Sequence, residues 1–182
     1  IPDMVIVKSR TSADDWMVFT SALGPTKYLV LNTAAAEATA SWAWNDTAPT
    51  STLVSLGNAG EVNGNTEDYV AYCFTNIQGY SKFGGYTGNG NADGPFVYTG
   101  FRPAFVMMKC ATRAGTDDWP VFDDKRLGFN VDNNALVVDD TDAERTQDDI
   151  DILSNGFKCR NSVTDVNANA DTLVYMAFAE AP

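Results

Sequence analysis

Oxygen-bearing side chains recur at alternate positions in the segment Asn89-Gly-Asn91-Ala-Asp93-Gly94. This spacing, followed by glycine, is typical of the first half of a calcium-binding loop, because Ca²⁺ prefers hard oxygen ligands. The acidic residue that closes such a loop at its twelfth position is missing, since Gly100 stands there. We therefore favour a hairpin turn, with a calcium site formed by Asn89, Asn91 and Asp93 as the alternative.

A second set of candidate metal ligands is a dense acidic run between residues 139 and 151. Its members are Asp139, Asp140, Asp142, Glu144, Asp148, Asp149 and Asp151. Like charges at this density are typical of a solvated loop, which is our interpretation. A cation bridging several of the carboxylates is the alternative.

Two tryptophans stand two residues apart and are followed by Asn45 and Asp46. In an extended segment Trp42 and Trp44 share one face. Exposed aromatic rings can stack on sugar rings, and Asn and Asp side chains can hydrogen-bond to sugar hydroxyls. These four residues are our candidate glycan-binding site. The competing interpretation packs both tryptophans into the core or a subunit interface.

The composition argues against several classes of function. The 182 residues include no histidine, the commonest general base, and no local motif activates a serine or cysteine nucleophile, so we predict no enzymatic activity. A net charge of −12 repels phosphate backbones and anionic lipids, so neither nucleic acid nor membrane is an expected partner. Cys73, Cys110 and Cys159 lie in apolar runs and are expected to be buried thiols, with one disulfide plus a free thiol as the alternative.

The sequence that contains these residues has an internal repeat. The stretch VNGNTEDYVAYCF at 62–74 returns as VNANADTLVYMAF at 166–178. PDMVIVK at 2–8 likewise matches PAFVMMK at 103–109, and DDWMVF at 14–19 matches DDWPVF at 117–122. The order of the matches is the same in both halves, which indicates an internal duplication.

The duplicated unit is predicted to be all-β. Short runs rich in Val, Tyr, Phe, Thr and Leu alternate with Gly, Asn, Asp and Pro clusters, as in antiparallel sheets. We predict two tandem antiparallel β-sandwich repeats of jelly-roll or lectin-like type, at 1–78 and 79–182. Strands are expected at 51–56 among others, a helix at 33–44, and a tight turn with positive φ at Asn63-Gly64.

The second copy carries a lead-in, residues 83–102, that has no counterpart before Ile1. The first unit is therefore expected to lack its opening strands. Either these strands lie upstream in a longer parent protein, or another subunit supplies them.

Four stretches identify a resemblance that covers nearly all of the chain. They are YSKF at 80–83, GYTGNGNADGPFVYTGFRPAFVMMK at 85–109, DILSNGFKCR at 151–160 and LVYMAFAEAP at 173–182. Together they resemble a family of bacteriophage structural proteins, common in marine and cyanobacterial phages and usually described as tail fibre or tail-associated proteins. The resemblance implies a virion protein, assembled in the host cytoplasm alongside other virion proteins, and a homotrimer.

Two functions are consistent with these observations. The first is a tail-fibre or appendage domain that contacts the host surface, most plausibly a glycan, through loops between strands. The second is a purely structural module that decorates a capsid or assembles a fibre and binds only other virion proteins.

Overall fold

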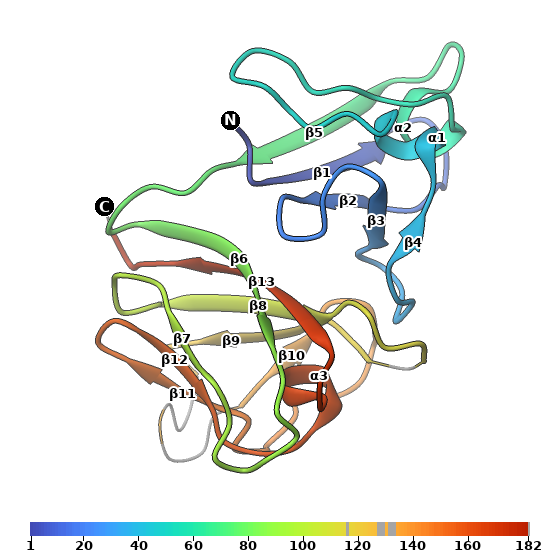
Figure 1. Cartoon of the computed structure of the whole chain (residues 1–182). Coiled ribbons are helices and arrows are strands. Elements are labelled where there is room, and N and C mark those ends of the chain that lie inside the picture. The colour runs from blue at the N-terminus through green and yellow to red at the C-terminus, as the bar shows by residue number, and fades with distance from the viewer. Residues whose placement is uncertain (116, 127–129, 131–133, 182) are drawn as a thin grey trace.

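The chain is almost entirely β-structure, built from short antiparallel strands (Figure 1). The computed structural model describes residues 1–115, 117–126, 130 and 134–181. In this part of the chain the helices are the single turns α1 (Ser41–Trp44), α2 (Gly60–Asn63) and α3 (Thr164–Asn167). Over the same residues no helix has the length and apolar character needed to span a bilayer. The predicted all-β, antiparallel sandwich class is confirmed.

The first repeat forms one five-stranded sheet in the order β4-β3-β2-β1-β5. Its strands are β1 (Met4–Ser9), β2 (Met17–Thr20), β3 (Lys27–Val30), β4 (Ala38–Thr39) and β5 (Tyr69–Phe74). Side chains of the central strand β1 alternate between the two faces, as the pleat requires. Met4 and Ile6 point to one hydrophobic cluster, while Val5 and Val7 point to another.

The second repeat also builds a five-stranded sheet, in the order β10-β9-β8-β13-β6, which has β6 beside β13 and, among the described residues, no counterpart of β4. Its strands are β6 (Ser81–Thr87), β8 (Phe105–Cys110), β9 (Pro120–Asp123), β10 (Leu136–Val137) and β13 (Thr172–Phe178). Strands β8 and β13 take the places of β1 and β5, as the sequence repeat predicts. Strand β6 comes from the lead-in and pairs along the whole of β13.

A third, three-stranded sheet exists only in the second repeat. Its order is β11-β12-β7, with β7 (Phe96–Tyr98), β11 (Ile150–Leu153) and β12 (Gly156–Cys159). Its inward side chains Val97, Ile152 and Phe157 pack against Met108 and Tyr175 of the five-stranded sheet. This pair of layers is the sandwich of the second repeat.

The two repeats also pack against each other through a shared core. Met4, Ile6 and Leu29 of the first repeat lie in one cluster with Met107 and Val174 of the second. The two five-stranded sheets thus bury one face each in common (Figure 1). The predicted boundary at residues 78 and 79 falls between β5 and β6, and it stays a prediction because the halves share this core.

Three local predictions were wrong. Only Ser41–Trp44 of the predicted helix at 33–44 is helical, because β4 takes up Ala38–Thr39. Residues 51–56 form a loop, with Leu53 68% exposed, since they lack a partner strand. Asn63 ends α2, and the positive φ of this turn falls instead on Thr66, at 65°.

Candidate functional site

The predicted glycan site is only partly available to a ligand. Trp42 and Trp44 lie on the helical turn α1, so the expected shared face of an extended segment does not form. Trp44 is 1% exposed and packs edge-on against Phe19, with ring centroids 5.9 Å apart. Trp42 is half-buried against Tyr28, with centroids 4.7 Å apart. The tryptophan pair therefore anchors α1 to the first sheet.

Asn45 and Asp46, in contrast, are exposed and both have positive φ, 51° and 48°. Asn45 ends α1 in the left-handed conformation, a common conformation at helix C-termini. Asn45 and Trp42 together border a shallow hollow of about 400 Å³ beside Gly57. Of the four predicted ligand residues, Trp42 and Asn45 line this hollow, while Trp44 and Asp46 do not.

The predicted calcium ligands form the turn that leads into β7. Asn89 Oδ1 accepts a hydrogen bond from the Asn91 amide at 3.0 Å, and Asn91 Oδ1 accepts one from the Asp93 amide at 2.9 Å. Asp93 Oδ1 lies 2.7 Å from Lys158 Nζ, and the ammonium lowers the pKa of this carboxylate. These oxygens already stabilise the turn, which is the interpretation we favoured from the sequence.

Two members of the acidic run form ion pairs with arginines. Glu144 pairs with Arg126 at 2.7 Å, and Asp151 with Arg160 at 3.2 Å. Arg145, inside the run, donates to Asp165 at 2.6 Å and also pairs with Asp118. Within the described residues no group of three or more Cys, Asp or Glu side chains has metal-binding geometry. Two carboxylates of the run are thus neutralised by arginines, and Arg145 adds a third ion-pair cluster with Asp118 and Asp165 outside the run.

A buried lysine lies next to this network. Lys109 on β8 is fully buried, and its ammonium donates to the carbonyls of Ala34, at 2.9 Å, and Asp117. The ammonium lies 6.0 Å from the centre of the Trp119 ring. Burial lowers the pKa of Lys109, while Asp139 and Asp117 oppose the shift. These contacts tie the loop after β3 to the second repeat, so we assign Lys109 a structural role.

The cysteines differ from the sequence prediction in one place. Cys110 and Cys159 are buried, and burial raises the pKa of these thiols to about 12 and about 11. Cys73 is exposed, because it lies on β5 at the edge of the first sheet. The prediction of three buried thiols was therefore wrong at Cys73.

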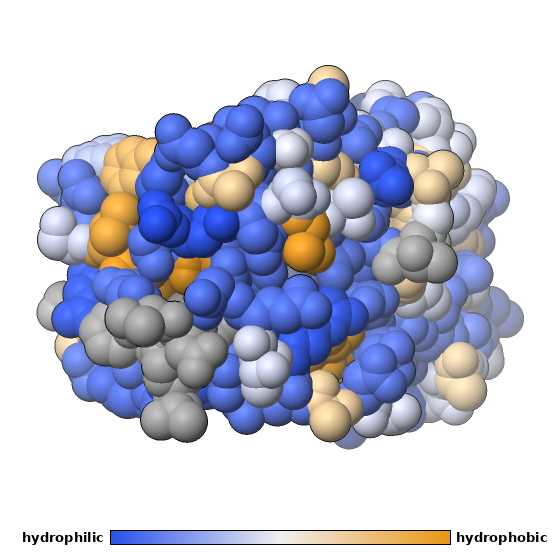
Figure 2. Space-filling view, turned by 90° about the horizontal axis from the view of Figure 1, so that it is seen from below, coloured by the Kyte–Doolittle hydropathy of each residue, from blue (hydrophilic) through white to orange (hydrophobic). Residues whose placement is uncertain are grey.

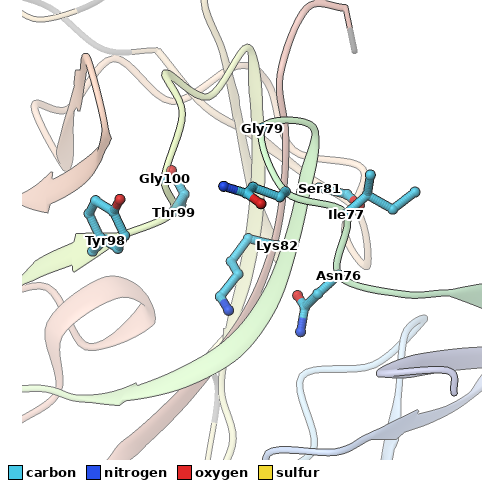
Figure 3. A pocket seen from close by; sticks show the side chains of 9 residues that line it. Asn76, Ile77, Gly79, Ser81, Lys82, Tyr98, Thr99 and Gly100 are labelled. Carbon is cyan, nitrogen blue, oxygen red and sulfur yellow. The ribbon is translucent and has the colours of Figure 1, made fainter.

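A further hollow is one that the sequence did not single out, and we call it the Tyr98 pocket (Figure 3). It measures about 320 Å³ and lies between the β5–β6 connection and the end of β7. The lining residues are Asn76, Ile77, Gln78, Gly79, Ser81, Lys82, Tyr98, Thr99 and Gly100.

Local hydrogen bonds set the shape of the pocket. The Ile77 and Ser81 amides exchange backbone hydrogen bonds, at 3.1 and 3.0 Å, across a turn that contains Gly79 with φ of 79°. Asn76 Oδ1 accepts from the Phe83 amide at 2.7 Å, which fixes the side-chain amide and leaves its Nδ2 group available for a ligand. Thr99 Oγ1 donates to the Phe101 carbonyl at 2.6 Å and fixes the opposite wall.

Two side chains give this pocket its chemical character. Tyr98 is 63% exposed, and Lys82 projects from β6 between Tyr98 and Asn76 (Figure 3). Among the described residues, no carboxylate pairs with Lys82. An aromatic ring, an amide and a free ammonium can contact a sugar ring, its hydroxyls and a negative substituent. The alternation of Phe96 and Tyr98 outward from β7 was the signal in the sequence that could have identified this site.

Seen from below, the molecule presents a largely hydrophilic face on which apolar side chains appear as separated spots (Figure 2). The fold and the pocket thus define an all-β protein with a small polar surface site.

Comparison with known proteins places the chain in a family. It belongs to the family described as a domain of unknown function, DUF7483, whose model matches residues 1–182. No curated protein and no solved structure matches the chain.

Proposed function

We propose that this chain is a structural protein of a bacteriophage virion, a tail-fibre or appendage domain that contacts saccharides of the host surface through the Tyr98 pocket. The motifs at 80–109, 151–160 and 173–182 support the virion assignment through their resemblance to phage tail proteins. The observation that carries the saccharide proposal is the exposed Tyr98 ring at the mouth of a polar pocket.

The pocket suits a sugar for physical reasons. A tyrosine ring presents a large apolar face with few rotamers to order on binding, and its hydroxyl can still hydrogen-bond. The backbone N–H of Phe83 already holds the side chain of Asn76 through its Oδ1 atom. Little side-chain entropy is therefore lost when Asn76 binds a sugar hydroxyl.

Lys82 indicates which sugars are favoured. The chain carries a net charge of −12, so an anionic saccharide is repelled by most of the surface. The unpaired Lys82 ammonium offers a local site for a carboxylate or sulfate group. Acidic saccharides are therefore expected to bind more tightly than neutral ones, with an affinity that falls as salt rises.

A glycan array with the purified chain tests this proposal. Tyr98→Ala is expected to weaken binding about tenfold or more, because aromatic anchors dominate small interfaces. Phe96→Ala is the matched control, since Phe96 is exposed on the same strand but does not line the pocket. Equal loss in both variants, or no binding by the folded chain, would contradict the proposal.

A purely structural role is the second candidate, and the uncovered edge of β5 favours it. In that case the chain binds other virion proteins and has no saccharide ligand. The homotrimer implied by the family resemblance is compatible with both candidate functions. Light scattering on the purified chain measures the oligomeric state directly.

A further inference from the structure

The duplication allows each edge of one repeat to be compared with the same position in the other. Strands β5 and β13 occupy equivalent places in their sheets, next to β1 and β8. β13 is paired on both sides, with β8 and β6. In the described residues, β5 pairs only with β1.

Equivalent side chains of the two strands differ in burial. Met176 is 6% exposed and lies in one cluster with Phe83 of β6, whereas Tyr72 at the same position of β5 is 45% exposed. Ala177 is fully buried beneath the three-stranded sheet, whereas its counterpart Cys73, in the repeat without that sheet, is exposed. The sequence of β5 is nevertheless that of a core strand, YVAYCF, without a charged residue, glycine or proline.

The backbone of β5 is open on the same side. The Arg10 amide donates to the Asp68 carbonyl at 2.7 Å, and the Asp3 amide donates to the Phe74 carbonyl at 2.8 Å. Even-numbered carbonyls therefore face β1. Because antiparallel ladders alternate, Tyr69, Ala71 and Cys73 direct their N–H and C=O groups outward.

The other edges of the two five-stranded sheets carry features that discourage pairing. Strand β6 contains Lys82, Gly84 and Gly85, and β4 and β10 are two residues long. Charges, glycines and shortness are the usual protections of an exposed edge. β5 has six residues and none of these protections.

We propose that the free edge of β5 binds an extended strand with the sequence pattern of β6, supplied in antiparallel orientation by a neighbouring protein chain. The pattern is Ser-Lys-aromatic-Gly-Gly-aromatic-Thr, as in residues 81–87. The second repeat shows the register. Phe178 lies opposite Ser81 and Leu173 opposite Tyr86, so Phe74 and Tyr69 take these places in the first repeat.

Strand addition of this kind gains affinity from main-chain hydrogen bonds and specificity from alternate side-chain pockets. The incoming aromatic residue equivalent to Phe83 falls opposite Tyr72. This contact would cover the exposed Tyr72 ring, which stacks at 6.5 Å on Trp16. The proposal is independent of saccharide binding, because the Tyr98 pocket contains no residue of β5.

The test uses the unmodified chain and a synthetic peptide with the sequence of residues 80–88. Its readout is the reaction rate of Cys73 with a thiol reagent, since the buried thiols of Cys110 and Cys159 have raised pKa values. At a peptide concentration about ten times its Kd, the rate is expected to fall about tenfold. A peptide with proline at the position of Gly84 is the matched control and should give no protection, because Gly84 lies opposite Tyr175, the equivalent of Ala71, and proline there removes a ladder hydrogen bond. A Cys73→Ser chain confirms which thiol is observed.

Two outcomes overturn the proposal. One is an unchanged Cys73 rate at saturating peptide in a chain whose circular dichroism shows it folded. The other is equal protection by the peptide and its proline variant, which would show that the peptide does not bind as a hydrogen-bonded strand.

Discussion

At the scale of single residues, equivalent positions of the two repeats make the same hydrogen bond but differ in burial. The Trp16 amide donates to Asn32 Oδ1 at 2.8 Å, and the Trp119 amide donates to Asp139 Oδ1 at 2.9 Å. The pair involving Trp119 is the more deeply buried one, and desolvation raises the pKa of Asp139. The duplicated Asp-Asp-Trp motif is thus a strand-entry turn, consistent with a structural reason for its repetition.

Glu67 allows a pH-dependence to be predicted. Hydrogen bonds from Ser12, at 2.7 Å, and Ser9, at 2.9 Å, lower the pKa of its carboxyl below the usual 4.5. The unfolded chain therefore binds more protons just below pH 4.5, so this contribution to stability is present above that pH and is lost as pH falls through the folded pKa. Glu67→Gln should flatten this part of the curve of Tm against pH.

Asp68→Asn is the control for this measurement. Asp68 is the adjacent carboxylate, and its side chain makes no hydrogen bond or ion pair within the described residues. In the Asp68→Asn variant, the acidic part of the curve of Tm against pH is expected to keep the shape found in the parent chain. Equal flattening in both variants would show that the net charge of the chain, and not the hydrogen bonds from Ser9 and Ser12 to Glu67, causes the pH-dependence of stability.

At the scale of elements, close backbone approaches decide which turns form. α1 is held by hydrogen bonds from the Gly57 amide to the Ala43 carbonyl, at 2.8 Å, and from the Ala59 amide to the Trp42 carbonyl, at 3.3 Å. A Cβ atom on Gly57 would lie 2.0 Å from the Trp42 carbonyl oxygen. This contact needs glycine for space, because no backbone atom can move aside cheaply.

Gly57→Ala is therefore expected to destabilise the chain by about 1–3 kcal/mol, the usual cost of overpacking. Gly60→Ala is the matched control, because a Cβ atom there meets nothing within 4 Å and alanine favours the helical turn α2. Urea unfolding of both variants measures the difference. Similar midpoints for the two variants would show that the loop before α2 adapts to the added methyl group.

At the scale of the whole molecule, the two repeats depend on each other. Trp119 is 1% exposed, and its indole Nε1 donates to the carbonyl of Val30, at 3.0 Å, in the other repeat. Trp119 also lies in the same core cluster as Met4, Val18 and Leu29. Because this core belongs to both halves, the chain is expected to unfold in a single cooperative transition.

Trp119→Phe tests this coupling. The substitution leaves the Val30 carbonyl without its donor and opens a small cavity, so a loss of about 2–4 kcal/mol is expected. Trp16→Phe is the control at the equivalent position, where the half-buried indole stacks on exposed Tyr72. Calorimetry should show one transition in each case, shifted mainly by Trp119→Phe. Two separate transitions would mean that the repeats fold independently.

The sequence by itself determined the fold class, the duplication and most strand positions. Alternation of apolar residues in segments such as MVIVK and FVMMK reports the pleat directly, because the period is a local property of the backbone. The recurrence of the motifs in the same order also indicated that the two halves have equivalent strands, as β1 and β5 of the first repeat and β8 and β13 of the second show.

Only the tertiary structure decided where each element packs. The sequence does not show that Trp44 is covered by the first sheet while Tyr98 is left exposed, because burial depends on which distant surfaces meet. The same holds for Cys73 and Ala177, two equivalent residues of one repeat pattern. Their difference arises from segments distant in the sequence, because the three-stranded sheet covers Ala177 and β6 pairs with β13 alone, which leaves the edge of β5 open.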